Sequence, residues 1–103
     1  MDRPKMAAQV AKRLLAAEMA VDIAIGETAR LLEALALASR EAGMPPDSGP
    51  QAPTLVSQAL TNLAGARGEI VGAHKALDGL ARRLSLPVSA FGVPIKPREA
   101  AVD

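Results

Sequence analysis

A short segment crowded with proline and glycine lies between two long stretches without interior proline, and this division constrains the fold more than any other feature. The segment from Gly43 to Pro53 holds four prolines and two glycines in eleven residues, a composition that admits neither helix nor strand. The flanking stretches are rich in alanine and leucine, which have high helix propensity. We therefore predict two helices, 3–42 and 53–85, joined by a linker at 43–53 into one antiparallel hairpin domain, 1–85.

The expected helix ends follow from local signals. Asp2 is a plausible N-cap, and Pro4 fits a first turn, where a missing N–H costs nothing. Gly43 can take the left-handed position after the first helix. The second helix should be capped by Thr54 or by Ala52, the residue before Pro53. It should end before Pro87, which disfavours helical backbone in the residue that precedes it.

Composition supports an all-α chain of one domain. Apolar residues make up 50% of the sequence, but Phe91 is the only aromatic residue, and cysteine, tyrosine and tryptophan are absent. Sheets favour aromatic and β-branched residues, which are scarce here. The net charge of +1 leaves no basic patch for nucleic acid. No uncharged apolar run reaches the roughly 18 residues that a membrane span needs. We expect a cytoplasmic protein with no transmembrane segment, and the alanine-rich and glycine-rich usage suits a bacterial genome.

Each predicted helix carries an uncharged line of residues spaced alternately three and four apart, the a/d pattern of coiled-coil packing. The line in the first helix is Val10, Leu14, Ala17, Val21, Ala24, Thr28, Leu31, Leu35, Ala38 and Ala42. The line in the second helix is Val56, Ala59, Leu63, Ala66, Ile70, Ala73, Leu77, Leu80 and Leu84. These lines predict the seam between the two helices.

The first helix has more apolar surface than one seam can bury. The surplus residues are Leu15, Ile23, Ile25, Leu32 and Leu37. Soluble monomers rarely leave such a patch exposed. We therefore expect a homo-oligomer, with a dimer favoured, in which two hairpins dock into a four-helix bundle. In the alternative, the C-terminal tail covers the patch within one chain.

The tail, 86–103, contains three prolines, and Phe91, Val93 and Ile95 alternate within it. This alternation predicts an extended segment with one apolar side. The sequence leaves open whether the segment packs on its own hairpin or on a neighbour's.

Four glycines lie inside the second predicted helix, where each costs about 1 kcal/mol relative to alanine. They are Gly65, Gly68, Gly72 and Gly79, and they share the face away from the predicted seam. One interpretation is a second contact face, where small residues let a partner approach closely. The other is an exposed face with no partner.

His74 is the only histidine. The run His74-Lys75-Ala76-Leu77-Asp78-Gly79 resembles, in part, the motif of histidine phosphotransfer domains, which are helical bundles with an exposed histidine. In that motif leucine follows two residues after the histidine and Lys-Gly comes next, so leucine and glycine stand one position late here. The resemblance implies His74 as phospho-acceptor.

Two other interpretations of His74 stay open. His74 and Asp78 are four apart, so both could reach one metal ion, but the chain has no Glu-x-x-His pair of the kind that bundle metal sites use. The alternative is a histidine at the seam edge whose nitrogens meet water or Asp78. We predict no catalytic residue, metal site or cofactor.

The function favoured by these observations is non-enzymatic: a small helical adaptor, regulator or structural component that binds a protein partner through its apolar faces. Two alternatives remain, a phosphotransfer-like protein that uses His74 and an amphipathic protein that binds a lipid or granule surface.

Overall fold

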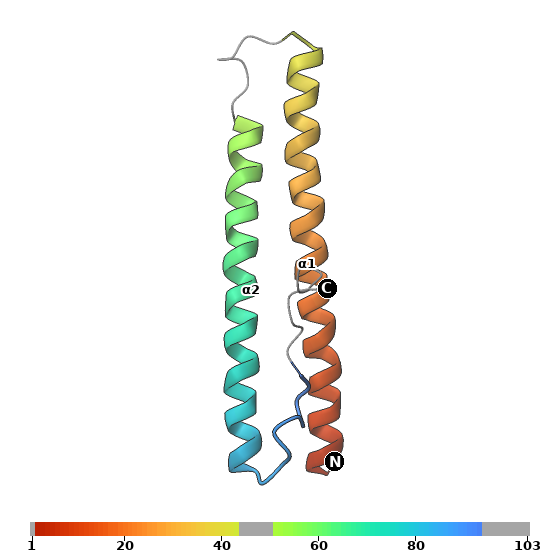
Figure 1. Cartoon of the computed structure of the whole chain (residues 1–103), viewed down its shortest axis with the longest axis vertical. Coiled ribbons are helices and arrows are strands. Elements are labelled where there is room, and N and C mark those ends of the chain that lie inside the picture. The colour runs from red at the N-terminus through yellow and green to blue at the C-terminus, as the bar shows by residue number, and fades with distance from the viewer. Residues whose placement is uncertain (1, 44–50, 94–103) are drawn as a thin grey trace, which may run out of the picture. The chain divides into compact units, whose positions relative to one another are not determined.

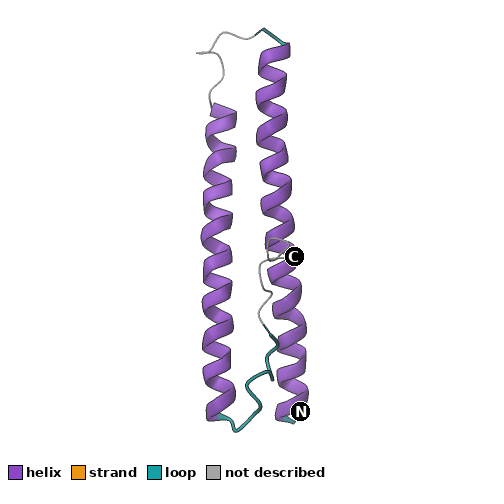
Figure 2. Cartoon of the chain, viewed as in Figure 1, coloured by secondary structure: helices purple, strands orange, loops and turns teal. Residues whose placement is uncertain are grey.

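The computed structural model describes residues 2–43 and 51–93, and it confirms an all-α fold. The two helices are α1 (Arg3–Glu41) and α2 (Gln51–Arg83), which form an antiparallel helical hairpin (Figure 1). Within the described ranges there is no strand, and turns and loops make up the remainder (Figure 2). The predicted helices, 3–42 and 53–85, agree with these bounds to within two residues.

Helix α1 begins and ends as its local sequence predicts. The Asp2 carboxylate accepts a hydrogen bond from the Lys5 amide at 2.8 Å, and the Asp2 carbonyl accepts the first helical bond from Met6. This is the N-cap arrangement that satisfies otherwise unpaired amides. At the other end Gly43 has a φ of 66°, the left-handed conformation that glycine adopts without steric cost.

Helix α2 starts earlier than predicted. It begins at Gln51, so Pro53 lies inside the first turn, and neither Thr54 nor residue 52 is the cap. The first four amides of a helix have no partner within the helix, so the missing N–H of Pro53 removes no helical hydrogen bond. The linker is correspondingly shorter than the predicted 43–53. Residues 44–50 lie outside the described ranges.

The end of α2 forms a Schellman motif. The Leu86 amide donates to the Ala81 carbonyl at 2.8 Å, and the Ser85 amide donates to the Arg82 carbonyl at 3.1 Å. This pairing requires a left-handed residue after the helix, and Ser85 takes that position with a φ of 57°. Serine therefore occupies a conformation that glycine normally supplies.

The described residues form two compact units, each containing part of both helices. The first, which we call the tail-bearing unit, comprises residues 2–19 and 68–93. The second, which we call the two-helix unit, comprises residues 20–43 and 51–67.

A small core lies in the tail-bearing unit. Ala7 of α1, Ala81 of α2 and Phe91 of the tail are each at most 1% exposed. Five partly buried residues pack around them: Val10, Leu77, Leu80, Leu86 and Ala90. Phe91 is the one large side chain among the fully buried residues. In this structure of a single chain the described part of the tail packs on its own hairpin.

The described part of the tail is not the extended segment that the alternation predicted. Turns close with hydrogen bonds from the Ala90 amide to the Pro87 carbonyl and from the Gly92 amide to the Ser89 carbonyl. Gly92 has a φ of 95°. These turns break the alternation. As a result Phe91 is buried, whereas Val93 is 68% exposed. Ile95, the third predicted member, lies outside the described residues.

The seam between the helices is displaced from the predicted lines. In α1 buried or partly buried residues recur at Ala7, Ala11, Leu14, Glu18, Val21, Ile25, Thr28, Leu32, Leu35 and Ser39. In α2 they recur at Pro53, Val56, Leu60, Leu63, Arg67, Ile70, His74, Leu77 and Ala81, and the spacing continues to Leu84 just after the helix. Alternate members match the prediction, and the others lie one residue later than a predicted position. Four of those predicted positions, Val10, Ala24, Ala66 and Leu80, are themselves partly buried, so this part of the prediction is also confirmed. The prediction chose uncharged lines, whereas the observed seam includes Glu18, Arg67 and His74.

Candidate functional site

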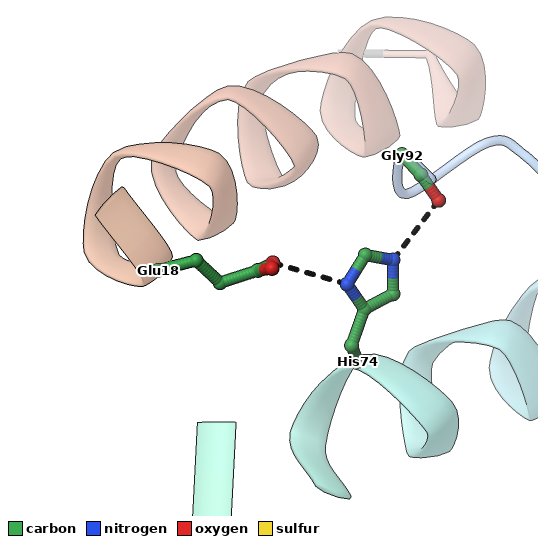
Figure 3. Close-up of polar contacts among 3 residues, drawn as sticks. All are labelled: Glu18, His74 and Gly92. Carbon is green, nitrogen blue, oxygen red and sulfur yellow. Dashed lines mark hydrogen bonds and ion pairs between the residues drawn. The ribbon is translucent and has the colours of Figure 1, made fainter. Parts of the chain in front are cut away.

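The most organised polar site in the described structure is centred on His74, which projects from α2 between α1 and the tail (Figure 3). Its side chain is 3% exposed, and that of its partner Glu18 is 12% exposed. Helix α2 supplies the ring, α1 supplies the carboxylate and the turn before Val93 supplies the carbonyl of Gly92. Three segments distant in sequence therefore meet at one imidazole.

Both ring nitrogens of His74 have acceptor partners. Nδ1 lies 3.1 Å from Glu18 Oε1, and Nε2 lies 2.9 Å from the Gly92 carbonyl oxygen. A carbonyl oxygen can only accept, so Nε2 carries a proton and donates. A neutral imidazole has one N–H, whereas the protonated ring has two. Protonated His74 therefore satisfies both contacts and forms a buried ion pair with Glu18.

These contacts raise the pKa of His74 above its ordinary value of 6.5. Burial alone lowers the pKa, because it disfavours the charged ring. The hydrogen bonds to Gly92 and Glu18, together with the negative charges of Glu18 and Asp78, outweigh that effect. A raised pKa means that the folded chain binds the proton more tightly than the unfolded chain. The resulting stabilisation is fully present below pH 6.5 and is lost as pH rises through the folded pKa.

Two interpretations of His74 can be compared with this geometry. The phosphotransfer hypothesis needs an exposed ring nitrogen, but the side chain is buried and both nitrogens are engaged. The seam-edge interpretation had the nitrogens meeting water or Asp78, whereas they meet Glu18 and Gly92. Asp78 acts on the ring only through its charge. Its Oδ1 is buried and, in the described part of the chain, makes no hydrogen bond.

The predicted metal and membrane properties can be compared with the same described residues. They contain no group of three or more histidine, aspartate or glutamate side chains arranged to hold a metal ion. Neither α1 nor α2 is long and apolar enough to cross a membrane.

The predicted partner surface divides into two sets. Ile25 and Leu32 are partly buried on the observed seam, so the hairpin itself uses them. Leu15, Ile23 and Leu37 remain 46%, 63% and 46% exposed. Sequence reasoning missed Leu31 and Leu55, which are 50% and 64% exposed. Leu31 was missed because the predicted seam included it.

The glycines of α2 meet no neighbouring atoms. A methyl group built at Gly65, Gly68, Gly72 or Gly79 would find nothing within 4 Å. Close approach of another backbone therefore does not explain these glycines within the described part of the chain. The predicted contact face with a partner remains a prediction.

Outside the tail-bearing unit, one ion pair crosses between α1 and α2 in the described residues. Arg67 Nε lies 2.7 Å from Asp22 Oδ1 in the two-helix unit, with side chains 42% and 41% exposed. Exposed pairs of this kind contribute little, typically under about 1 kcal/mol. The pair explains how a charged residue is accommodated on the observed seam, but it does not create a binding site.

Comparisons with known proteins give no identity for the chain. No protein-family model matches it, and no curated protein or solved structure is significantly similar to it.

Proposed function

We propose that this chain is a non-enzymatic interaction protein that self-associates, two hairpins docking through the two-helix unit into a four-helix bundle. The observation that carries the proposal is the absence of any buried residue among the described positions of the two-helix unit, 20–43 and 51–67. Four large apolar side chains are nevertheless 46% or more exposed there: Ile23, Leu31, Leu37 and Leu55. A helical pair gains most of its stability from burying an apolar face. The unit therefore lacks the core that a second hairpin would supply.

The heptad pattern favours one particular side of the unit. The partly buried seam occupies two positions in every seven, a and d. The position before each a is also apolar, and the residues at these positions, with Leu55 beside them, form what we call the apolar flank. It consists of Ala24, Leu31, Ala38, Ala52, Leu55, Ala59 and Ala66. Helices that face the core of a bundle carry three apolar positions in seven, whereas a bare coiled-coil seam carries two.

Both helices contribute the apolar flank to one side of the unit. Leu31 on α1 is displaced from the partly buried seam by about a quarter turn, and Leu55 on α2 by about a third of a turn, in the same rotational sense, at about 100° per residue. In an antiparallel pair, displacements of the same sense place side chains on the same side. The flank therefore presents two adjacent apolar rows, in which alanines leave room for the larger residues of a second copy.

The test is the molar mass of the chain in solution, measured by light scattering after size exclusion over a range of concentrations. We expect a dimer at low micromolar concentration. The double variant Leu31→Lys/Leu55→Lys should weaken dimerisation about a hundredfold or more, because it removes two buried leucines and brings like charges together. The replaced side chains are half exposed or more in the single hairpin, so helicity at low concentration should be unchanged.

A matched control uses the opposite face of α1. Ile23→Lys/Leu37→Lys adds the same charge at positions that are 63% and 46% exposed and lie about half a turn from the seam. We expect this variant to remain dimeric. A monomeric parent chain would overturn the proposal. Dissociation of the control, with a dimeric Leu31→Lys/Leu55→Lys variant, would overturn the assignment to the apolar flank.

A further inference from the structure

We propose that the segment from Leu84 to Val93 is a pH-sensitive strap, which protonated His74 holds against α1 and which is released when the ring loses its proton. The inference does not depend on self-association. It rests on the meeting of three segments at one buried imidazole, shown in Figure 3.

The strap has few polar ties to the rest of the tail-bearing unit. Its start is tied to the end of α2 by backbone bonds from the Leu84, Ser85 and Leu86 amides. Beyond these, the described polar contacts from outside are the bond from His74 Nε2 to the Gly92 carbonyl at 2.9 Å and a bond from Arg3 Nη1 to the Leu84 carbonyl at 3.4 Å. The second is long and exposed, so it contributes little. His74 therefore supplies the main polar anchor at the far end of the strap.

The apolar anchor lies beside this polar one. Phe91 precedes Gly92 and packs with Ala7 and Ala81. If the Gly92 carbonyl loses its donor or the imidazole ring shifts, Gly92 is no longer held in place, and neither is the backbone of the neighbouring Phe91. Loss of the strap would expose Phe91 and uncover Ala7 and Ala81, creating an apolar surface that the closed form hides.

The charges around the ring favour the protonated form. Glu18 and Lys12 face the site from α1, Asp78 lies one turn along α2, and the strap itself carries no charged side chain between residues 84 and 93. Of these charged groups, only Glu18 contacts the ring directly. If the ring loses the Nδ1 proton, the Nδ1 lone pair faces the Glu18 carboxylate oxygen at 3.1 Å. The two electron-rich atoms then repel each other. Alternatively Nδ1 keeps the remaining hydrogen, and then Nε2 has none to donate to Gly92.

The experiment takes advantage of the composition of the chain. The sequence has no cysteine, so Val93→Cys gives one attachment point for a nitroxide label at a position that is 68% exposed. Electron paramagnetic resonance spectra recorded between pH 5.5 and pH 9 report whether the strap is held. We expect the mobile fraction of the label to rise at least fivefold across a single-proton transition centred above pH 6.5. The ring signals of His74, the only histidine, should titrate with the same midpoint in the NMR spectrum.

Variants separate the strap from general loosening. His74→Gln keeps a donor but cannot titrate, so the pH response of the label should disappear. Glu18→Gln removes the charge that favours the protonated ring, so the midpoint should move to lower pH. The same label at the exposed position Gln58, in the two-helix unit, should report no change over this pH range. A ring that titrates while the Val93 label stays immobile would overturn the proposal, as would an unchanged pH response in His74→Gln.

Discussion

The tail-bearing unit and the two-helix unit contain parts of the same two helices but differ in what covers them. In the first, the tail adds a third layer, and Ala7, Ala81 and Phe91 become fully buried. In the second, no described residue is buried, although its helices are at least as rich in alanine and leucine. Two helices of small residues therefore form a seam without a core. A third element, whether the tail or another chain, is needed to exclude water.

The units also differ in how they accommodate charge on the seam. In the tail-bearing unit, Glu18 and His74 are nearly buried and are completed by a backbone carbonyl. In the two-helix unit, Arg67 and Asp22 remain about 40% exposed. A buried polar pair favours one register, because a shifted register leaves its charges unpaired. Register is thus specified more strongly in the unit that also has the apolar core.

The largest expected effect comes from removing the third layer. Phe91→Ala should lower the free energy of unfolding by about 3–5 kcal/mol, the usual range for deleting a buried phenyl group. Chemical denaturation followed by circular dichroism at a fixed protein concentration measures it. The control is Val93→Ala, two residues further on and 68% exposed, which should change stability by less than about 0.5 kcal/mol. Equal effects of the two variants would contradict the assignment of the core to the tail-bearing unit.

A smaller effect compares two glycines. Gly92→Ala should destabilise by about 1–2 kcal/mol, because the φ of 95° is unfavourable for any residue with a Cβ. Space is not the cause, since the new methyl group would lie 3.6 Å from Ala11 Cβ. Gly72→Ala, inside α2 with open space around it, should instead stabilise by up to about 1 kcal/mol. Thermal melting distinguishes the opposite signs.

The result for Gly72→Ala also tests the predicted glycine contact face. If a partner backbone of a second copy lay against this face, the added methyl group would weaken association. The contact face would be supported if Gly72→Ala melted at a lower temperature than the parent chain, and if this difference disappeared on dilution to the monomer. A higher melting temperature for Gly72→Ala at every concentration would contradict the predicted contact face.

The helices could be predicted from sequence because their ends depend on neighbouring residues. Asp2 caps amides within one turn, and Gly43 adopts its left-handed conformation within the same local segment. The start of α2 was misplaced because Pro53 is compatible both with a position before a helix and with the first turn. Local sequence does not distinguish these two cases.

The seam and the candidate site could not be predicted in the same way because they depend on distant pairs. Glu18 and His74 are 56 residues apart, and nothing in the residues around either one indicates the other. Excluding charged positions kept Glu18, Arg67 and His74 out of the predicted lines and put the neighbouring alanines Ala17, Ala66 and Ala73 in their place. The predicted positions that lie beside the observed seam still mark an apolar side of the helices. The predicted lines therefore combine part of the seam with most of the apolar flank. Whether the tail would pack on its own chain also depended on this distant geometry.

The smallest expected effect compares the C-terminal ends of the two helices. Both end on a left-handed residue, but α1 in the two-helix unit uses Gly43 and α2 in the tail-bearing unit uses Ser85, with φ values of 66° and 57°. Ser85→Gly should stabilise by about 0.5–1 kcal/mol, because relief of the Cβ clash exceeds the extra freedom that glycine gains on unfolding. Ser85→Ala, the control, should give no gain, since alanine keeps the Cβ. A lower melting temperature for Ser85→Gly would show that the serine side chain itself holds the start of the strap, and that the two ends are built differently.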